Sequence, residues 1–372
     1  MKNFNKNLIF FLPNFSKGGA SYAILRLCEH LNKKNYKLNV ICIGNCELKN
    51  DLKKHKVKIH EINSISTFNS ISKLKDITKK IINSTKCKSI FISNHHYANV
   101  ISMMALKNIE VKKILIERTS LEQLKRAYNF KDFIKKRIIL CLIKIFYPSS
   151  DLVIANSKRE SQDIKKFCNS KTIHIYPAAY KKIEIKNKKK FKKKINILNV
   201  GSLIKEKGIN TIIEAINILD NKNIHLDVLG KGYDQAQDEG KNLLKLSEKY
   251  NLQKQIKFHG FKNDLKKFYV KADLYINSSH CEGFSSAVVE AMNYNVPVIC
   301  SDAKGGNREI VAHGKAGFLF KVDDINDLKN KITICLNKQQ NYNRKIKYAK
   351  KHIQQFNYLN NFSKYKKIFK KI

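Results

Sequence analysis

The chain has 372 residues, 43% of them hydrophobic, and a formal net charge of +43 at pH 7. This length suffices for two domains with separate hydrophobic cores, and the hydrophobic content excludes a disordered tail. No apolar run has the length of a membrane span, and we expect no cleavable signal segment at the start of the sequence.

Short apolar runs alternate with helical patterns through the first half of the chain. The first run, residues 8–12, is followed by Gly18 and Gly19 and by a periodic helix over residues 21–31. This unit can bring a backbone close to a phosphate or sugar, although a glycine pair alone is more often a plain tight turn. The further strand-like runs are residues 38–43, 89–93, 113–117, 152–155 and 172–176. Such alternation predicts an α/β fold with a doubly wound parallel sheet, which binds ligands at the carboxyl ends of its strands.

Two adjacent histidines, His95 and His96, follow the run at residues 89–93. We therefore expect them at the carboxyl edge of the sheet. A histidine there can hydrogen-bond a sugar hydroxyl or orient an acceptor. Two partly exposed loop histidines without a function are an equally good interpretation, and the sequence does not decide which of the pair would act.

The segment Phe130–Phe146 has a helical pattern, is very apolar and is flanked by cations. One interpretation is a helix that packs on the sheet. The other is an interfacial helix, with lysines on anionic headgroups and Phe or Ile side chains at the acyl boundary. An enzyme that acts on a lipid-linked substrate would need such a surface.

A basic run over residues 180–194 separates this region from a second alternating region. The strand-like runs of the second region are residues 195–200, 224–229, 256–259, 274–276 and 296–299. The sequence therefore predicts a first domain over residues 1–179, a solvated basic linker over residues 180–194 and a second α/β domain over residues 195–354.

Glycine-containing loops follow the first strands of the second region. Gly201 and Lys207 lie in the loop after the first strand, where glycine permits close backbone approach and the lysine offers a charge to a diphosphate. Gly230 ends the second strand, and Gly260 and Phe261 follow the third. Since a glycine after a strand usually means only a turn, each loop alone is a weak indication of a binding site.

Two carboxylates, Glu282 and Glu290, are separated by seven residues, the first in a loop and the second inside the helix that follows. Gly283 frees the backbone at the turn, and Ser285 or Ser286 is a good N-cap for that helix. The helix N-terminus suits a phosphate, and Glu290 suits the two hydroxyls of a ribose. The competing interpretation is a strand, a turn and a helix with one exposed and one capping glutamate.

Further pieces around these glutamates follow one another in a fixed order. They are residues 282–285 (EGFS), 288–292 (VVEAM), 296–299 (VPVI), Gly305 and Gly306 with 309–311 (EIV), and His313 and Gly314 with 317–319 (GFL). This succession resembles the donor-binding half of the family-four glycosyltransferases, which are retaining GT-B enzymes that use nucleotide sugars.

The resemblance implies two Rossmann-like βαβ domains that face each other across a donor-binding cleft, with a C-terminal helix near residues 355–372 crossing back onto the first domain. It also implies transfer of a glycosyl group to an acceptor hydroxyl with retention. No metal or other cofactor is implied, and the pair Asp323 and Asp324 is interpreted as a helix cap far from the cleft loops.

In this family the sugar, the ribose and the diphosphate of the donor contact separate groups. The resemblance assigns the donor sugar to Glu282, the ribose to Glu290 and the diphosphate to Lys207. We expect Lys207, Glu282 and a histidine of the pair His95 and His96 at the catalytic centre. The other donor-binding positions that it implies are Gly18, Gly19, Gly201, Gly230, Gly260, Phe261, Gly283, Phe284, Ser285 and Ser286.

One residue departs from the family pattern. Ser202 stands where the family has an arginine, which leaves the diphosphate with one forked donor fewer. Either Lys205 compensates for the missing arginine or the donor binds more weakly.

The high positive charge has two possible explanations, an anionic partner or a bias in composition. Only seven of the 73 basic residues are arginine, and abundant asparagine and isoleucine indicate A- and T-rich codons as one source of the lysines. Nucleic-acid readers use arginine forks and exposed aromatic residues, and neither is clustered here. We therefore expect an anionic membrane surface, and no nucleic acid, as a partner.

The nine cysteines lie singly, as in a reduced cytosolic protein, and a zinc site is not expected.

The main hypothesis is a cytoplasmic bacterial-type glycosyltransferase, peripheral on the inner face of the cytoplasmic membrane. It would use a UDP-sugar to build a surface glycan on a lipid-linked or lipopolysaccharide acceptor. Two alternatives stay open: a nucleotide-sugar 2-epimerase of the same fold, and a basic RNA- or membrane-binding protein without enzymatic activity.

Overall fold

The computed structural model describes residues 6–16, 18–32, 36–184, 193–232, 238–337 and 339–372. The chain divides into two compact units, the first formed by Met1–Pro177 with Asn361–Ile372 and the second by Ala178–Asn360. The chain therefore passes from one unit to the other twice. Part of the predicted linker, residues 185–192, lies outside the described residues.

The described part of the first unit contains a seven-stranded parallel sheet in the order β3-β2-β1-β4-β5-β6-β7. Its strands are β1 (Lys6–Phe11), β2 (Tyr36–Ile43), β3 (Lys58–Ile62), β4 (Ser89–Asn94), β5 (Lys112–Glu117), β6 (Leu152–Ala155) and β7 (Thr172–His174). The strand order reverses between β1 and β4, where Phe11 pairs with Ser93. In an open parallel sheet this reversal marks the crevice that takes a ligand.

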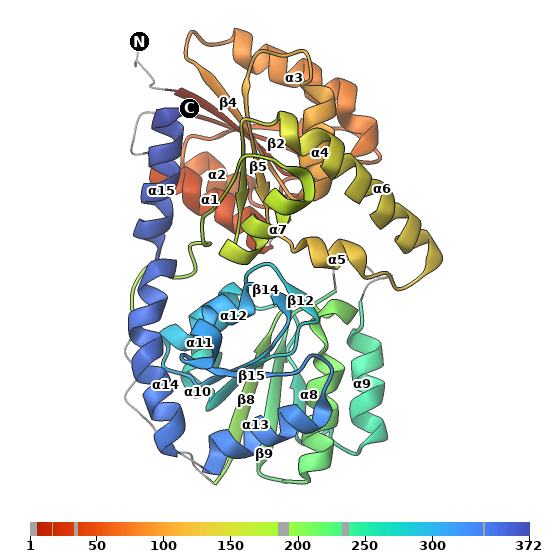
Figure 1. The fold of residues 1–372 in the computed structure, drawn as a ribbon, viewed down its shortest axis with the longest axis vertical. Coiled ribbons are helices and arrows are strands. Elements are labelled where there is room, and N and C mark those ends of the chain that lie inside the picture. The colour runs from red at the N-terminus through yellow and green to blue at the C-terminus, as the bar shows by residue number, and fades with distance from the viewer. Residues whose placement is uncertain (1–5, 17, 33–35, 185–192, 233–237, 338) are drawn as a thin grey trace. The chain divides into compact units, whose positions relative to one another are not determined.

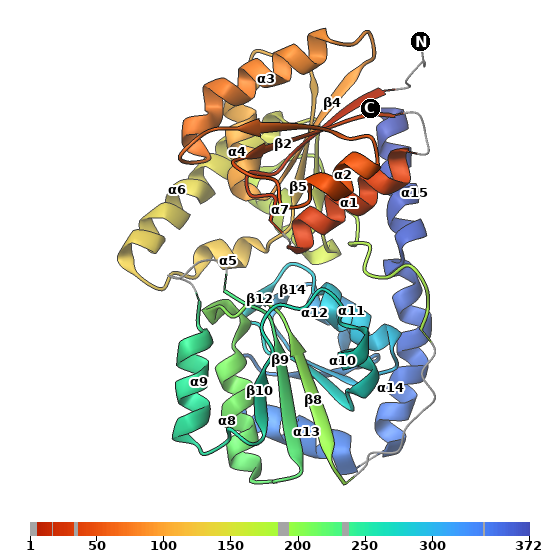
Figure 2. The same ribbon diagram turned by 180° about the vertical axis from the view of Figure 1, so that it is seen from behind.

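Helices cover both faces of this sheet. They are α1 (Gly19–Asn32), α2 (Lys49–Lys54), α3 (Ile71–Asn83), α4 (His96–Ala105), α5 (Leu121–Lys125), α6 (Phe130–Phe146), α7 (Lys158–Cys168) and, from the end of the chain, α15 (Tyr358–Lys371). Figures 1 and 2 show α3, α4 and α6 on one side of the sheet and α1 and α15 on the other. The contact of α15 is aromatic, since Phe362 stacks on His30 at 4.5 Å and Phe369 meets Tyr36 edge-on at 6.3 Å.

The second unit has the same plan. Its main sheet, in the described residues, has six parallel strands in the order β10-β9-β8-β11-β13-β15. They are β8 (Ile195–Val200), β9 (Ile224–Leu229), β10 (Ile256–Phe258), β11 (Leu274–Asn277), β13 (Val298–Ser301) and β15 (Phe318–Phe320). A separate parallel pair joins β12 (Cys281–Glu282) to β14 (Lys304–Gly305). The strand order reverses between β8 and β11, so this sheet also has a crevice position.

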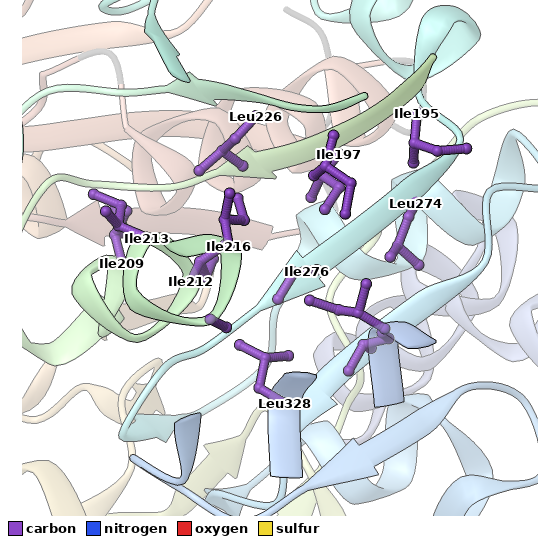
Figure 3. Close-up of a cluster of buried hydrophobic side chains, with 14 of the residues drawn as sticks. Ile195, Ile197, Ile209, Ile212, Ile213, Ile216, Leu226, Leu274, Ile276 and Leu328 are labelled. Carbon is purple, nitrogen blue, oxygen red and sulfur yellow. The ribbon is translucent and has the colours of Figure 1, made fainter. Parts of the chain in front are cut away.

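The helices of the second unit are α8 (Ile209–Leu219), α9 (Gly240–Lys249), α10 (Lys266–Lys271), α11 (Ser286–Asn293), α12 (Asn307–Ile310), α13 (Ile325–Asn337) and α14 (Gln339–His352). The helix α8 has isoleucines at helical spacing on its inner face, among them Ile212 and Ile216. Figure 3 shows these side chains converging on Ile197 and Ile276 of the sheet, with Leu328 of α13 beside them. Burial of this apolar surface stabilises the layered arrangement.

The predicted α/β architecture is confirmed, and so is the helix over Phe130–Phe146. The helix predicted over residues 21–31 begins earlier, at Gly19. The strand β3 was not predicted, because it is an edge strand whose polar residues interrupt the apolar pattern. No helix in the described ranges is long and apolar enough to cross a membrane.

Candidate functional site

The centre of the candidate site in the second unit is an ion pair between Lys207 and Glu282. Lys207 ends a short turn of 3-10 helix after β8, and Glu282 lies in β12. The Lys207 Nζ donates to Glu282 Oε2 at 2.5 Å, and Ser279 Oγ donates to the same oxygen at 3.1 Å. Because both charged side chains are mostly buried, each holds the other in place. The structure thus brings together the two residues to which the sequence assigned the diphosphate and the donor sugar.

The predicted glycines lie side by side at the carboxyl edge of the same sheet. Gly201 N donates to Leu229 O, and Gly230 N donates to Gly260 O, each at 3.0 Å. Gly230 has a φ of +147°, and a Cβ there would lie 1.7 Å from Gly201 O. Only glycine fits this approach, so the loops after β8, β9 and β10 form one continuous backbone surface. The exposed ring of Phe261 lies next to it, with Lys231 Nζ 5.9 Å from the ring centroid.

A second backbone contact fixes the loop that carries Glu282. Gly305 in β14 has a φ of +124°, and a Cβ there would lie 1.8 Å from Glu282 O. Gly306 N donates to the same carbonyl at 2.8 Å. The glycine pair that the sequence singled out is therefore the support of the Glu282 loop.

Glu290 lies in α11, and Tyr269 of α10 donates a hydrogen bond to its Oε2 at 2.8 Å. Burial, reinforced by the charge of Glu290, raises the pKa of Tyr269 well above its usual range, so the phenol stays a donor. Tyr269 also stacks on Tyr294 at 5.4 Å. The carboxylate is thus oriented by an aromatic support that the sequence reading missed, because residues 269 and 290 come from separate helices.

The N-terminus of α11 differs in one respect from the prediction. Ser285 occupies the N-cap position with an extended backbone, but its side chain does not bond to a helix amide. Its Oγ accepts instead from Asn277 Nδ2 at 3.3 Å, and Asn277 Oδ1 accepts from Asn307 Nδ2 at 3.0 Å. The predicted N-cap position of Ser285 is confirmed, but the buried amide network directs its side chain toward the sheet and no side-chain capping bond forms. Ser286 begins the helix itself.

Three further predicted donor-binding positions are Phe284, Lys205 and Ser202. The ring of Phe284 is buried and meets Phe356 edge-on at 5.1 Å, so this residue can face a ligand only through its backbone. Lys205 Nζ lies 3.9 Å from Glu239 Oε1. Ser202 lies half-buried in the loop after β8, and its carbonyl accepts from Ile204 N at 3.0 Å.

Asp323 and Asp324, which were predicted together as a helix cap, make different contacts. Asp324 Oδ1 accepts from Asp327 N at 2.8 Å, which confirms a cap at the start of α13. Asp323 is not far from the loops: its Oδ1 lies 2.7 Å from Nε2 of His280, the residue before β12. That part of the prediction is wrong, because β15 lies beside β13 and brings the following turn, with a φ of +61° at Asp323, to this edge. No group of three or more His, Cys, Asp or Glu residues in the described ranges could hold a metal ion.

In the first unit the two histidines at the end of β4 have different surroundings. His96 begins α4 and is buried, with Nδ1 3.0 Å from Thr119 Oγ1 and 3.6 Å from Glu117 Oε1. His95 is half-buried and has φ +83° and ψ 142°, a strained combination for a residue other than glycine. Strain of this kind persists only where the surroundings enforce it.

The surroundings are a buried hydrogen-bond network around Glu117, the last residue of β5. Tyr147 OH donates to Glu117 Oε2 at 2.7 Å, and Thr119 Oγ1 donates to Oε1 at 3.0 Å. Asn99 Nδ2 donates to Tyr147 OH at 3.0 Å. Although burial raises the pKa of Glu117, the contacts with His96, with the charge of His95 and with Tyr147 outweigh it and lower the pKa to about 2. The buried carboxylate thus anchors the first turn of α4.

His95 is left as the histidine that is not part of these hydrogen bonds. Its ring lies 3.9 Å from the ring of His96. Burial, followed by the charge of His96, lowers the pKa of His95 to about 3, against the opposing effect of Glu117. A neutral imidazole at this edge can exchange hydrogen bonds with a hydroxyl.

The predicted glycine pair lies at the same edge. Gly19 begins α1, and Gly18 O accepts from Tyr22 N at 3.0 Å in its first turn. Because β1 and β4 are neighbours, the loop with Gly18 and Gly19 and the loop with His95 flank the reversal of strand order.

Comparison with known proteins finds a family match in the second unit. Residues 181–352 match the family model of glycosyl transferases group 1, a range that includes all the predicted positions from Gly201 to Glu290. The N-acetylgalactosamine-N,N'-diacetylbacillosaminyl-diphospho-undecaprenol 4-alpha-N-acetylgalactosaminyltransferase of Campylobacter jejuni is 30% identical over 244 residues. That alignment covers 62% of this chain and 62% of the relative, so the chain spans less than two thirds of it.

Two other proteins are similar over most of their length. The capsular polysaccharide biosynthesis glycosyltransferase CapM of Staphylococcus aureus is 25% identical over 350 residues, which cover 88% of this chain and 87% of CapM. The crystal structure of Anabaena Alr3699/HepE in complex with UDP and glucose superposes with a TM-score of 0.81 at 20% identity, covering 98% of this chain and 99% of HepE. Residues 181–352 thus match the group 1 glycosyl transferases, and the chain as a whole has the GT-B fold of two Rossmann-like units.

Proposed function

We propose that this protein is a group 1 glycosyltransferase that moves a sugar from a nucleoside diphosphate sugar to an acceptor hydroxyl. The observation that carries the proposal is the Lys207–Glu282 ion pair beside the N-terminus of α11. A buried cation, a carboxylate and a helix N-terminus in one loop system are the groups that a sugar diphosphate needs. The family match of residues 181–352 supports this assignment.

The chemistry requires stabilisation of negative charge on the departing diphosphate. Lys207 supplies a cation, and the first amides of α11 supply donors that the Ser285 side chain does not occupy. When a phosphate takes the Lys207 ammonium, Glu282 loses that partner and becomes available to the hydroxyls of the donor sugar. The ion pair therefore prepares both groups for the donor.

We assign the ribose to Glu290, whose carboxylate is held by Tyr269. UDP is the proposed nucleotide, in line with the UDP and glucose in the structure of HepE. Retention is proposed on the resemblance to family-four enzymes, in which the departing phosphate assists deprotonation of the acceptor. His95 of the first unit is the proposed hydrogen-bonding group for the reacting sugars.

The proposed acceptor is a glycan on a lipid carrier, as in the name of the Campylobacter relative. Support comes from α6, which has an exposed apolar stripe. Phe130 is 75% exposed, Ile138 54% and Ile145 65%, and Ile134 and Cys141 lie between them at helical spacing. Such large apolar residues in contact with water call for a partner surface.

Cations flank the stripe on both sides. Residues three and four apart share a helix face, which places Arg137 and Lys144 along one border and Lys131 and Lys135 along the other, all exposed. The opposite face packs into the unit through Ile139, Leu140 and Ile143. An apolar stripe between rows of cations is the arrangement of a helix that lies in the surface of an anionic membrane. We therefore propose that α6 places the enzyme on the membrane that holds its acceptor.

The donor assignment is tested by calorimetric titration of the purified chain with UDP. Glu290→Ala removes the proposed ribose contact, so we expect UDP affinity to fall about tenfold or more, or roughly 1.4 kcal/mol. Glu248→Ala, at an exposed glutamate of α9, is the matched control and should leave the affinity unchanged. Equal affinity in the Glu290 variant and the wild type would refute the ribose contact. Absence of binding to UDP, GDP and ADP by the wild type would refute the enzyme assignment.

A further inference from the structure

Arg118, the residue after β5, has a guanidinium group that is fixed but not neutralised. Its Nε and Nη2 donate to Asn94 Oδ1 at 3.2 and 2.9 Å. In the described part of the chain no carboxylate lies within ion-pair distance of this guanidinium; the adjacent Glu117 is engaged by Tyr147 and Thr119. Arg118 is half-buried, and burial lowers the pKa of its guanidinium against the opposing effects of Tyr365 and Glu117. A cation in such a position calls for an anion.

The bonds to Asn94 leave one edge of the guanidinium open. Nε and Nη2 form its side edge, which Asn94 Oδ1 occupies. The terminal edge, formed by Nη1 and the second hydrogen of Nη2, carries two parallel N–H groups. This fork matches the spacing of two oxygens of a phosphate.

Asn94 adds a second donor that also needs a partner. It is the last residue of β4 and is completely buried. Because Oδ1 accepts from Arg118, the orientation of the carboxamide is fixed, and Nδ2 is buried without a hydrogen-bond partner among the described residues. Buried donors are almost always bonded, so an orphan beside an unpaired arginine indicates a missing ligand atom.

The two groups lie at the place where the sheet topology predicts a ligand. Asn94 precedes His95 and ends a neighbour strand of β1, at the reversal of strand order. The guanidinium of Arg118 bonds to Asn94, the residue directly before His95, and its charge also contributes to lowering the pKa of His95. Asn156, directly after the neighbouring strand β6, donates through Nδ2 to Arg118 O at 3.3 Å and fixes its backbone.

We propose that the terminal fork of Arg118, together with Asn94 Nδ2, binds a phosphate group of the acceptor. The proposal rests on the proposed function and specifies its acceptor side: a substrate with a phosphate or diphosphate near the sugar that receives the glycosyl group. The same chemistry could come from the diphosphate of the donor, so the experiment separates the two sources.

The test is calorimetric binding of inorganic pyrophosphate to the full chain in the presence of saturating UDP, which occupies the donor site. We expect wild type to bind, and Arg118→Gln and Arg118→Lys to raise the Kd at least about tenfold. The lysine variant keeps the charge and loses the fork. Arg159→Gln, at an exposed arginine of α7 in the same unit, is the control and should bind like wild type.

The variant Asn94→Asp distinguishes a loss of pyrophosphate binding from a loss of the fold. Asn94→Asp keeps the shape and pairs with Arg118, but it removes the Nδ2 donor and adds a negative charge. It should abolish pyrophosphate binding while the thermal unfolding midpoint stays within a few degrees of wild type. Wild-type pyrophosphate binding in Asn94→Asp would overturn the proposal.

Transfer kinetics then assign the source of the phosphate. We expect Arg118→Lys to raise KM about tenfold for a diphospho-lipid acceptor and to leave KM for an uncharged alkyl glycoside acceptor and the Kd of UDP unchanged. A weaker Kd for UDP, or loss of pyrophosphate binding when UDP saturates, would assign the fork to the donor and overturn the proposal. If the wild type does not bind UDP, the proposed function fails, whereas pyrophosphate binding measured without UDP still reports on the Arg118 site.

Discussion

At the residue scale, the adjacent residues His95 and His96 have opposite effects on stability. His96 is buried and belongs to the network of Glu117 and Thr119. His95 lies outside that network, in a strained conformation with φ +83°. The network stabilises the start of α4, and the strain at His95 lowers stability. We infer that the ring of His95 makes a functional contact that offsets this strain.

Substitutions at the two positions should therefore have opposite effects. His95→Gly relieves the positive φ and should raise the free energy of unfolding by about 1 kcal/mol, while transfer activity falls. His96→Ala leaves buried polar groups unpaired and should lower the free energy of unfolding by about 1–3 kcal/mol. Urea denaturation and UDP-sugar turnover measure both effects. Lower stability of His95→Gly together with normal turnover would show that the conformation is structural.

The pH dependence of stability provides a control for His95→Gly. The pKa of His95 is lowered to about 3, below its ordinary value of 6.5. Between these values only the unfolded chain takes up the proton, so titration of His95 does not change the free energy of unfolding above pH 6.5 and lowers it progressively as the pH falls toward 3. The gain in stability of His95→Gly over wild type should therefore grow as the pH is lowered through this range.

Residues with a local sequence signal were the ones that could be predicted. Lys207 and Glu282 belong to recognisable glycine-containing segments, and Glu290 follows Glu282 at a recognisable spacing inside α11. Tyr269 and Arg118 could not be found in this way, because their importance comes from contacts with Glu290 and Asn94 that the fold creates. Ser285 occupies the predicted N-cap position, but its side chain makes no capping bond, because its Oγ accepts from Asn277 instead.

At the element scale, buried strands were predictable and edge strands were not. Strands such as β1 and β4 are buried on both faces, so their sequences are continuous apolar runs. The strand β3 has one neighbour and exposed polar residues, and the pairing of β12 with β14 depends on Gly305 meeting Glu282. The helix α6 was predictable in its extent, but only the structure shows that its apolar residues divide between a buried and an exposed face.

The exposed face of α6 gives a direct prediction for membrane binding. Ile134→Ser with Ile138→Ser should weaken co-sedimentation with vesicles of phosphatidylglycerol and phosphatidylcholine at least about tenfold, because two apolar anchors are lost. Leu244→Ser, at an exposed leucine of α9, should have no effect. Lys131→Glu should weaken the same binding, whereas Lys245→Glu of α9 should not.

The vesicle composition separates this mechanism from its alternatives. Vesicles of pure phosphatidylcholine should bind the wild type less well, and high salt should reduce the difference. If the α6 variants bind as the wild type does, α6 is not the membrane surface. A preference for RNA over anionic vesicles would favour the basic nucleic-acid-binding alternative.

At the scale of the whole molecule, the two units have the same plan but carry different chemistry. Both sheets reverse their strand order beside the first strand, and each reversal places loops at one carboxyl edge. The second unit contains a cation, two carboxylates and a glycine-lined backbone surface. The first contains a neutral histidine, an arginine without a carboxylate at ion-pair distance among the described residues, and α6. The α/β plan of both units follows from the repeated alternation in the sequence, whereas neither the sugar nor the acceptor can be derived from that alternation.

The central claim, that this chain transfers glycosyl groups with retention, is tested most directly by NMR of the reaction product. The purified chain is incubated with α-configured UDP-sugars and a diphospho-lipid glycan, and UDP release and the new anomeric signal are followed together. The account predicts an α-linked product with equimolar UDP, and a rate at least about tenfold lower in Lys207→Ala, a loss of roughly 1.4 kcal/mol of transition-state stabilisation. A β-linked product, an epimerised donor without acceptor, or no turnover of any nucleotide sugar would contradict it.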